Sequence, residues 1–407
     1  MNRDFSLLGT VAGRTRAPLT PSPGGEGWGE GAVSRRKIVP AEPNLARMRD
    51  LFACFLVLVL APAFASAETT MAFDLKASRA PDEPKLEVTH DCRAAASVVR
   101  DEDVTIDGDL SDWPANATPL RARGEAQPDD LSAVAFVAVS PTSFYFACEV
   151  TDDQHYQRAY GDEMWQFDSV QFAIDPLFER TVGRYSVHTH EIGICFVNGG
   201  PLVWRWHRPL GLKGEEVPGA DLAVAFSEGK TTYELRIPLH ELWPLRPALA
   251  HPVGFTYVVN DTDGSDSRDF IAWASGIGSG KDSSSFGILT FPEDRQDVQV
   301  AARFLAPTDP TPADHPQEWT MHVYAKQAGK LTVECDGKIE HGPYKGSRAF
   351  ARTRFEVPAG VSNWRLSADL ARLAPARIKL RPSVALENAA DAVESRPLTV
   401  YVYRPSR

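Results

Sequence analysis

Two polar stretches of the chain, far apart in the sequence, each carry one tryptophan. Trp165 lies within residues 162–176, and Trp273 lies within residues 258–291. Each stretch contains a strand-like apolar run, and polar residues surround each indole. An exposed indole offers a flat apolar face on which the C–H groups of a sugar ring can pack. If a β-sandwich sets the two rings apart, they predict a slot for a sugar.

Polar side chains that could bond sugar hydroxyls lie in the same regions. Trp165 and Gln171 both occupy odd positions of one run, so side-chain alternation predicts that they share a strand face if no bulge intervenes. Glu191, Asn260 and Lys281 are further candidates, although a surface role would explain each of them equally well. The remaining tryptophans of this region are expected in the core, at the sandwich ends or in a secondary apolar patch: Trp113, Trp204, Trp206 and Trp243.

Acidic turns supply oxygen atoms of the kind that Ca²⁺ prefers. The candidate ligands are Asp107, Asp261 and Asp263, each in a short acidic cluster. Acidic turns are also common without metal, because Asp side chains stabilise turns by themselves. Asp168 differs from these, because a carboxylate in the middle of a strand must find a partner. We expect it to accept a hydrogen bond from a turn.

The elements that would position these residues are strands. Helical periodicity is scarce, and residues 239–242 predict one helical turn. Runs rich in Val, Phe, Tyr and Ile, separated by turn residues, are typical of a sandwich or barrel. They predict strands over 133–139, 143–150, 167–175, 191–197, 221–226, 231–238, 253–260, 268–274 and 286–291. We therefore expect an antiparallel β-sandwich over residues 104–295.

A second all-β block follows the first. Residues 308–312 are typical of a linker, and residues 296–407 predict a smaller β-sandwich of immunoglobulin type with no chemical motif of its own. Its expected strands are 319–325, 331–334, 350–357, 364–368, 377–381 and 398–403. Its role stays open, with a spacer or docking domain as the default.

The N-terminal part predicts export. Residues 51–61 form an apolar run too short to span a bilayer, and Ala65-Ser66-Ala67 follows it as a cleavage pattern. A secretory signal peptide over 48–67 that starts at Met48 fits this pattern and predicts a secreted or periplasmic protein. Residues 1–47 are rich in Pro and Gly and are expected to be a disordered leader or a start-site extension. Residues 68–103 are weakly patterned and predict a linker or an edge strand.

Bulk properties exclude some functions. The 407-residue chain has a net charge of -11, whereas nucleic-acid binding needs a basic surface. No segment outside the signal predicts a membrane span. Four cysteines remain after the signal, and they could form disulfides in three connectivities or be buried small apolar residues: Cys92, Cys148, Cys195 and Cys335.

An ordered series of motifs resembles a family 9 carbohydrate-binding module. The series comprises IDGDLSDW from Ile106, FYFACEVTDD from Phe144, WQFDSVQFAID from Trp165, YELRIP from Tyr233 followed by Gly254-Phe255 and Val259-Asn260-Asp261, and finally Trp273 with Phe286-Gly287-Ile288-Leu289. The resemblance implies a β-sandwich, a sugar bound between two aromatic rings, and bound calcium, and it does not imply catalysis. The family commonly has Glu where this chain has Gln171, which puts the affinity or the sugar preference in doubt.

The sequence is compatible with three functions. The favoured one is a secreted, non-catalytic protein that binds a poly- or oligosaccharide, with a secreted enzyme or a cell-surface polymer as possible partners. The second is a glycoside hydrolase, which needs two carboxylates that face each other across a cleft. The third is a haem redox module of the related DOMON group, with Met164, His188 and His190 as ligands, although Met164 is more simply a packing residue.

Overall fold

The computed structural model describes most of the chain after the predicted signal peptide. The described residues are 69–81, 90–126, 130–209, 212, 214–264, 268–278, 280–292, 298–307, 309–387, 389, 393–395 and 397–404. The predicted leader 1–47 and signal peptide 48–67 lie outside them. Among the described residues, no helix has the length and apolar character needed to cross a membrane.

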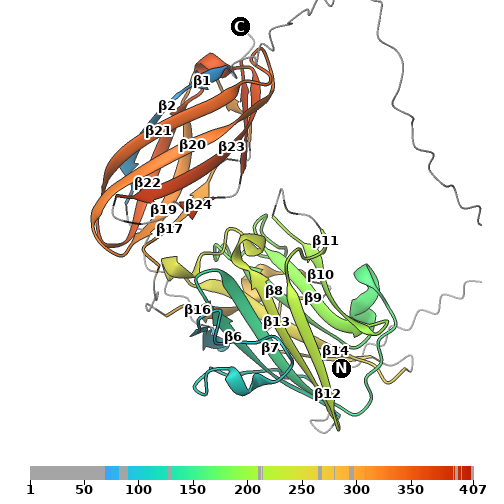
Figure 1. Cartoon of the computed structure of the whole chain (residues 1–407). Coiled ribbons are helices and arrows are strands. Elements are labelled where there is room, and N and C mark those ends of the chain that lie inside the picture. The colour runs from blue at the N-terminus through green and yellow to red at the C-terminus, as the bar shows by residue number, and fades with distance from the viewer. Residues whose placement is uncertain are drawn as a thin grey trace, which may run out of the picture. The chain divides into compact units, whose positions relative to one another are not determined.

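Two sheets build the larger sandwich (Figure 1). The 8-stranded sheet has the order β11-β10-β9-β8-β14-β16-β3, with β15 paired to β14. Its strands are β3 (Arg93–Ala95), β8 (Ser169–Asp175), β9 (His190–Val197), β10 (Gly200–His207), β11 (Glu215–Glu216), β14 (Val253–Asp261), β15 (Asp269–Ala272) and β16 (Gly287–Thr290). The 6-stranded sheet has the order β12-β13-β7-β6-β4, with β5 paired to β6. Its strands are β4 (Ser97–Val98), β5 (Leu120–Arg121), β6 (Leu131–Val139), β7 (Ser143–Asp152), β12 (Asp221–Ser227) and β13 (Lys230–Pro238).

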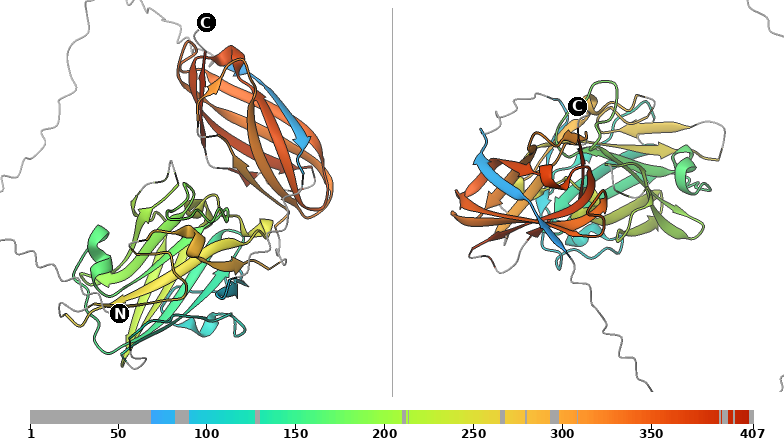
Figure 2. Two further views of the ribbon diagram at one scale, coloured as in Figure 1. Left: turned by 180° about the vertical axis from the view of Figure 1, so that it is seen from behind. Right: turned by 90° about the horizontal axis from the view of Figure 1, so that it is seen from above.

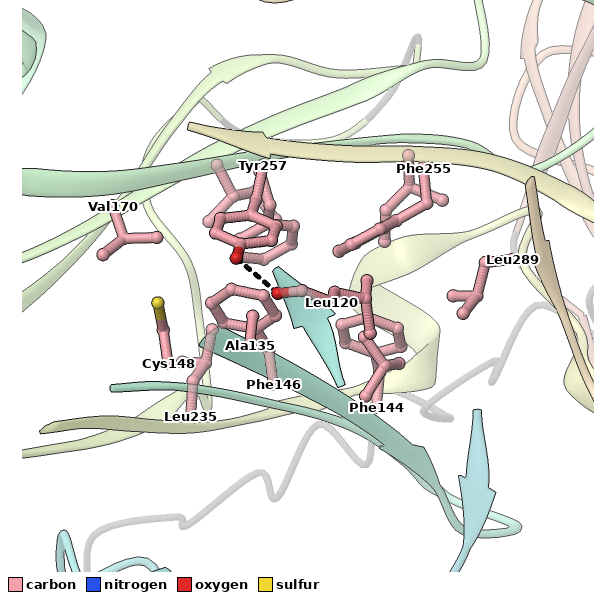
Figure 3. Close-up of a cluster of buried hydrophobic side chains, with 14 of the residues drawn as sticks. Leu120, Ala135, Phe144, Phe146, Cys148, Val170, Leu235, Phe255, Tyr257 and Leu289 are labelled. Carbon is pink, nitrogen blue, oxygen red and sulfur yellow. Dashed lines mark hydrogen bonds between the residues drawn. The ribbon is translucent and has the colours of Figure 1, made fainter. Parts of the chain in front are cut away.

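Alternating apolar side chains from the two sheets fill the core of this sandwich. Figure 3 shows Phe144 and Phe146 of β7 lying below Phe255 and Tyr257 of β14. The rings of Phe146 and Phe255 are 6.2 Å apart, and the buried Tyr257 hydroxyl donates to the carbonyl of Leu120 at 2.6 Å. This bond satisfies the one polar atom that Tyr257 carries into the core, as a buried hydroxyl requires.

The predicted strands of this sandwich are confirmed. Observed boundaries lie close to the predicted ones, because turn residues bound these runs of β-branched and aromatic residues. The predicted turn at 239–242 is a 3-10 helix. The 3-10 helices among the described residues are η1 (Leu110–Asp112), η2 (Gly161–Gln166), η3 (Leu239–Leu242), η4 (Pro247–Leu249), η5 (Ser283–Ser285) and η6 (Ala371–Leu373).

The C-terminal sandwich also has two sheets. The 7-stranded sheet has the order β1-β21-β20-β23-β25-β18, with β24 on β23, and the 4-stranded sheet has the order β17-β19-β22-β2. Their strands are β1 (Thr70–Ala72), β2 (Asp74–Arg79), β17 (Val300–Leu305), β18 (Thr311–Pro312), β19 (Gln317–Ala325), β20 (Gly329–His341), β21 (Arg348–Val357), β22 (Gly360–Asp369), β23 (Ala376–Leu386), β24 (Val393–Glu394) and β25 (Leu398–Tyr403). The set β17-β19-β22 facing β21-β20-β23-β25 is an immunoglobulin-type Greek key.

The prediction of a linker over 68–103 is wrong for most of its described residues, and the alternative of an edge strand is correct. β1 and β2 are edge strands of the C-terminal sandwich, where the blue strands lie among orange and red ones (Figures 1 and 2). β3 and β4 are edge strands of the larger sandwich. Short edge strands bury few side chains, so their sequence pattern is weak.

All four cysteines of the described chain are free thiols. Cys148, Cys195 and Cys335 are buried, and burial raises the pKa of each thiol above its ordinary value. Of the two open interpretations, the structure supports small apolar residues for these three.

Candidate functional site

The outer face of the 8-stranded sheet carries the polar residues singled out from the sequence. In β8 the side chains of Val170, Phe172 and Ile174 point into the core, so Gln171 points to the other face. The same alternation places Glu191 of β9 and Asn260 of β14 on that outer face. All three are at least 93% buried from solvent, at 5%, 2% and 7% exposure, because neighbouring segments cover the sheet.

Strand register orders these residues into rows across the sheet. Gln171 is directly opposite Gly193 of β9 and Val258 of β14. Asn260 lies in the row on one side, where it pairs with Phe270 of β15. Glu191 lies in the row on the other side, opposite Ala173 of β8. These two rows, which flank the row of Gln171 and are called the outer rows below, are four residues apart along β8. This corresponds to roughly 13 Å.

Trp165 reaches this face from η2, and not from a strand as the sequence predicted. Met164 beside it is fully buried against β9 and β10, and its carbonyl accepts a bond from the Gln157 amide at 2.9 Å. Trp165 is 40% exposed, and the Arg268 guanidinium lies over its ring at 4.4 Å from the centroid. The buried methionine therefore anchors a turn that presents the indole outward.

A second tryptophan joins the face from β10, where Trp204 lies directly opposite Gly193 and Trp206 follows two residues later on the same face. The register of β10 against β9 shifts between Arg205 and His207, and Trp206 is the additional residue. Its ring covers Gly193, where a Cβ atom would come within 2.4 Å of it. Its indole nitrogen donates to the carbonyl of Asp162 at 3.1 Å. Trp206 was expected in the core or in a secondary patch, and it lines the cleft instead. The β-bulge at the register shift places His207 opposite Glu191, so His207 also lies on this face.

These residues line one cleft of about 980 Å³. Five of the six predicted binding residues line it, namely Trp165, Gln171, Glu191, Asn260 and Lys281. The lining also includes residues that the sequence did not single out for binding: Asp162, Arg184, Tyr185, Trp206, His207, Val258, Arg268, Phe270, Ile277 and Gly278. Ligand sites of globular proteins reach this size and combine aromatic walls with a few polar groups.

The sixth predicted residue, Trp273, is not in the cleft. It is 8% exposed and belongs to the core between the sheets, with its ring 6.1 Å from that of Phe255. A Cβ atom at Gly287 would come within 2.6 Å of this ring. The prediction of Trp273 as a stacking residue is therefore wrong. Ile271 and Trp273 both occupy inward positions, whereas the polar neighbours of Trp273 in sequence had suggested exposure.

Phe270 is the aromatic residue that this part of the chain gives to the cleft. It is 62% exposed and lies directly opposite Asn260. The signal that could have found it is alternation along β15, where Ile271 points inward and Phe270 outward. An exposed Trp273 would place Phe270, three residues earlier, on the inward face of β15. The prediction for Trp273 therefore assigned the inward and outward faces of β15 the wrong way round.

The carboxylates among the described lining residues have partners. The Lys281 ammonium lies 2.5 Å from Glu191 Oε1, and it also lies over the Tyr185 ring at 5.6 Å from the centroid. Asp162 Oδ1 accepts a hydrogen bond from the Trp204 indole at 2.9 Å. Burial and the neighbouring Glu191 carboxylate raise the pKa of the Tyr185 hydroxyl above its ordinary value. These contacts hold the walls of the cleft in place.

A cluster of acidic residues lies at the ends of β7 and β14. One carboxylate oxygen each from Asp152, Asp261 and Asp263 lies within 4.8 Å of the others. Burial and the neighbouring carboxylates of Asp152 and Asp263 raise the pKa of Asp261 to about 7. Asp261 Oδ1 is buried and has no hydrogen-bond partner among the described residues. A hard divalent cation would satisfy this oxygen and relieve the repulsion, so the donor set fits calcium.

The structure does not bring Asp107 to this cluster. Its carboxylate accepts from the backbone N–H of Asp109 at 2.9 Å, and its own N–H donates to Glu234 at 3.0 Å. Asp107 therefore stabilises a turn, which was the alternative explanation for acidic clusters.

Asp168 has the structural role that the sequence predicted. Its Oδ1 accepts from the backbone N–H of Thr262 at 2.9 Å, and its Oδ2 accepts from the N–H of Tyr156. These bonds connect the segment before Trp165 with the segment after β14. Burial raises the pKa of Asp168 to about 8, although both backbone bonds favour the charged form.

The residues considered for haem have structural contacts. Met164 is a packing residue, as its alternative interpretation predicted. His188 Nδ1 lies 3.1 Å from the Glu179 carboxylate, and His190 Nε2 lies 2.8 Å from the carbonyl of Trp243. These contacts give both rings a role in the fold.

Comparison with known families identifies the larger sandwich. Residues 103–293 match the family model described as carbohydrate family 9 binding domain-like. The larger sandwich belongs to this family. The family 9 domain thus extends from the segment just before η1 to the segment that follows β16. No curated protein matches the chain.

Solved structures of family 9 modules are among those similar to this chain. One is a module from Caldicellulosiruptor kristjanssonii in complex with cellotriose, with 19% identity and a TM-score of 0.40, covering 54% of this chain and 100% of that chain. Another, from the same organism and in complex with glucose, has 19% identity and a TM-score of 0.40, and covers 51% of this chain and 98% of that chain.

Proposed function

We propose that this chain is a non-catalytic protein that binds a poly- or oligosaccharide in the cleft of its family 9 domain. The observation that carries the proposal is the gathering of Trp165, Phe270 and Trp206 around a floor of Gln171 and Asn260. Aromatic faces bury the apolar side of a sugar ring, while amides both donate to and accept from its hydroxyls. A sugar on Trp165 replaces Arg268 on the ring or packs on its other side.

The test compares exposed aromatic residues inside and outside the cleft. Trp165→Ala and Phe270→Ala are expected to weaken retention in affinity electrophoresis on the polysaccharides that retain the parent. Tyr401→Ala in the C-terminal sandwich is the matched control, because Tyr401 is 43% exposed against 40% for Trp165. If both cleft variants bind like the parent, the sugar site lies elsewhere.

The engaged carboxylates favour binding over hydrolysis. A glycoside hydrolase needs one free carboxylic acid and a second carboxylate across the scissile bond, whereas Glu191 is paired with Lys281 and Asp162 accepts from Trp204. Incubation of the full chain with each retained polysaccharide is expected to produce no new reducing ends. Release of reducing ends by the parent, and not by Glu191→Gln, would establish hydrolysis.

Calcium is proposed as a structural ligand of the acidic cluster. Asp152, Asp261 and Asp263 would hold it, and the ion would neutralise carboxylates that otherwise repel one another. Ca²⁺ is expected to raise the melting temperature of the parent and to have a smaller effect on Asp261→Asn. An equal Ca²⁺ effect on both proteins would contradict this assignment.

We also propose that the chain is exported, on the basis of the signal-like segment 48–67. Expression with the native N-terminus is expected to yield a processed protein that begins at Glu68. Mass spectrometry of the intact secreted chain measures this directly. An unprocessed chain that stays in the cytoplasm would contradict the proposal.

A further inference from the structure

The net charge of the cleft lining is positive, whereas the net charge of the whole chain is negative. The chain has a net charge of -11. The described cleft lining, in contrast, holds three Arg or Lys side chains and two carboxylates: Arg184, Arg268 and Lys281 against Asp162 and Glu191. A cleft lined with one sign of charge concentrates ligands of the opposite sign.

The carboxylates of the lining are already engaged. Glu191 is 2% exposed and forms its ion pair with Lys281, so the two charges cancel locally. Asp162 accepts a hydrogen bond from the Trp204 indole. The charges that remain for a ligand are therefore those of the two arginines and of Asp162, so positive charge stays in excess.

Neither arginine has an acidic partner within the described part of the chain. Arg184 is exposed, and its guanidinium forms no hydrogen bond or ion pair with any described residue. Arg268 is also exposed, and its only described contact is with the face of the Trp165 ring. A guanidinium that stacks on an aromatic face keeps its N–H groups free to donate in its own plane.

The two arginines lie toward different ends of the cleft floor. Arg268 is on Trp165 and precedes Phe270, which pairs with Asn260 in one outer row. Arg184 adjoins Tyr185, whose ring lies under the Lys281 ammonium that binds Glu191 in the other outer row. A charged group on a sugar at either end of the floor therefore meets a guanidinium.

We infer that the cleft selects saccharides that carry an anionic group, and that Arg184 and Arg268 donate to this group. The inference deepens the proposed function and depends on it. The planar guanidinium presents two parallel N–H donors that match a carboxylate, and such bidentate bonds are among the strongest that proteins make. A carboxylate at C6 of a hexuronic acid and a sulfate ester both supply the required oxygens.

The experiment compares matched sugars on the full chain by isothermal titration calorimetry. The probes are neutral trisaccharides of glucose, galactose and mannose, their C6-carboxylate counterparts and their C6-sulfate esters. For the series that binds, we expect a carboxylated or sulfated trisaccharide to bind at least about 10-fold more tightly than the neutral one at low salt. The advantage should shrink as the ionic strength rises from about 0.01 M to about 1 M, because salt screens partly exposed charges.

Charge-neutralising variants test which residues are responsible. Arg184→Gln and Arg268→Gln are each expected to reduce the ratio of anionic to neutral affinity by about 3-fold to 10-fold. Arg121→Gln is the matched control: Arg121 is an exposed arginine on β5 of the other sheet, and this change should leave the ratio as it is in the parent. The sulfated and carboxylated probes show which anion the arginines prefer.

The outcomes separate this inference from the proposed function. Equal or weaker binding of both anionic probes, with neutral probes still bound, overturns the inference and leaves sugar binding intact. A ratio that stays the same in both cleft variants also overturns the role of the arginines. If no probe binds and the polysaccharide panel is also negative, the proposed function itself fails.

Discussion

The outer faces of two sheets, one in each sandwich, show what turns a sheet surface into a site. On the 7-stranded sheet of the C-terminal sandwich, arginines pair with acids on neighbouring strands, as in Arg348 with Asp336 at 2.7 Å and Arg352 with Glu334 at 3.2 Å. On the 8-stranded sheet, Arg184 and Arg268 rise from segments between strands and have no acidic partner among the described residues.

The difference lies in the connections and not in the strands. Both faces follow the same alternation of inward apolar and outward polar residues. The face of the larger sandwich is walled by η2 and by the segment that carries Lys281, and these walls produce a cleft of about 980 Å³. A sheet supplies a rigid floor, and the loops above it decide whether the floor binds a ligand.

The largest expected effect is on stability, and it tests whether Trp273 is a core residue and not a cleft residue. Trp273→Ala removes a large ring from the packed interior, so we expect the free energy of unfolding of the larger sandwich to fall by about 3–5 kcal/mol. Urea denaturation followed by tryptophan fluorescence measures it. The exposed Tyr401→Ala should stay within about 0.5 kcal/mol of the parent. A loss below about 1 kcal/mol for Trp273→Ala would mean that its ring is not a core residue.

The second prediction concerns pH in the C-terminal sandwich. Burial and the neighbouring Arg303 lower the pKa of His322 to about 3. An unfolded histidine takes up a proton below about pH 6.5, whereas the folded imidazole stays neutral down to about pH 3. The free energy of unfolding should therefore decrease as the pH falls through this window, by at most about 1.4 kcal/mol per pH unit from this group.

His322→Gln is the test of this pH effect. The variant lacks the titrating ring, so its unfolding free energy should depend less steeply on pH between about 3 and 6.5. Chemical denaturation at several pH values provides both slopes. Parallel slopes for parent and variant would show that His322 does not carry the effect.

A third, smaller effect is expected on the preference for anionic sugars when the ion pair between Glu191 and Lys281 is broken. Glu191→Gln releases Lys281 from its ion pair and adds a free cation to the cleft. The preference for carboxylated over neutral trisaccharides should then rise by about 3-fold at low salt. Calorimetry on the same sugar pairs measures it. An unchanged preference would indicate that Lys281 does not face the ligand.

The smallest effect is expected on the outer face of the 7-stranded sheet in the C-terminal sandwich. Arg348→Gln breaks a pair in which the side chains are 41% and 50% exposed. Exposed ion pairs contribute little, so the unfolding free energy should change by about 0.5 kcal/mol and sugar affinity should not change. A clear loss of sugar binding would show that the C-terminal face takes part in recognition, which would remove the distinction between the two faces.

The sequence alone determined most of the fold and a large part of the cleft. Runs rich in Val, Phe, Tyr and Ile between turn residues placed the strands, and alternation gave Gln171 its face, because both patterns depend only on neighbouring residues. Glu191 and Asn260 were named as binding candidates, and both line the cleft. Asp168, which lies directly before β8, was correctly expected to accept a structural hydrogen bond, since a buried carboxylate must find donors. The order of the motifs also predicted the family of the larger sandwich.

Only the tertiary structure decided which aromatic rings face the ligand. The packing of Trp206 on Gly193, the 3-10 turn at Trp165 and the inward position of Trp273 each depend on contacts with another strand. The same holds for the edge strands β1 and β2, which join a sandwich far away in the sequence. Whether an indole is buried is set by the surface that packs on it, and a single run of sequence does not contain that surface.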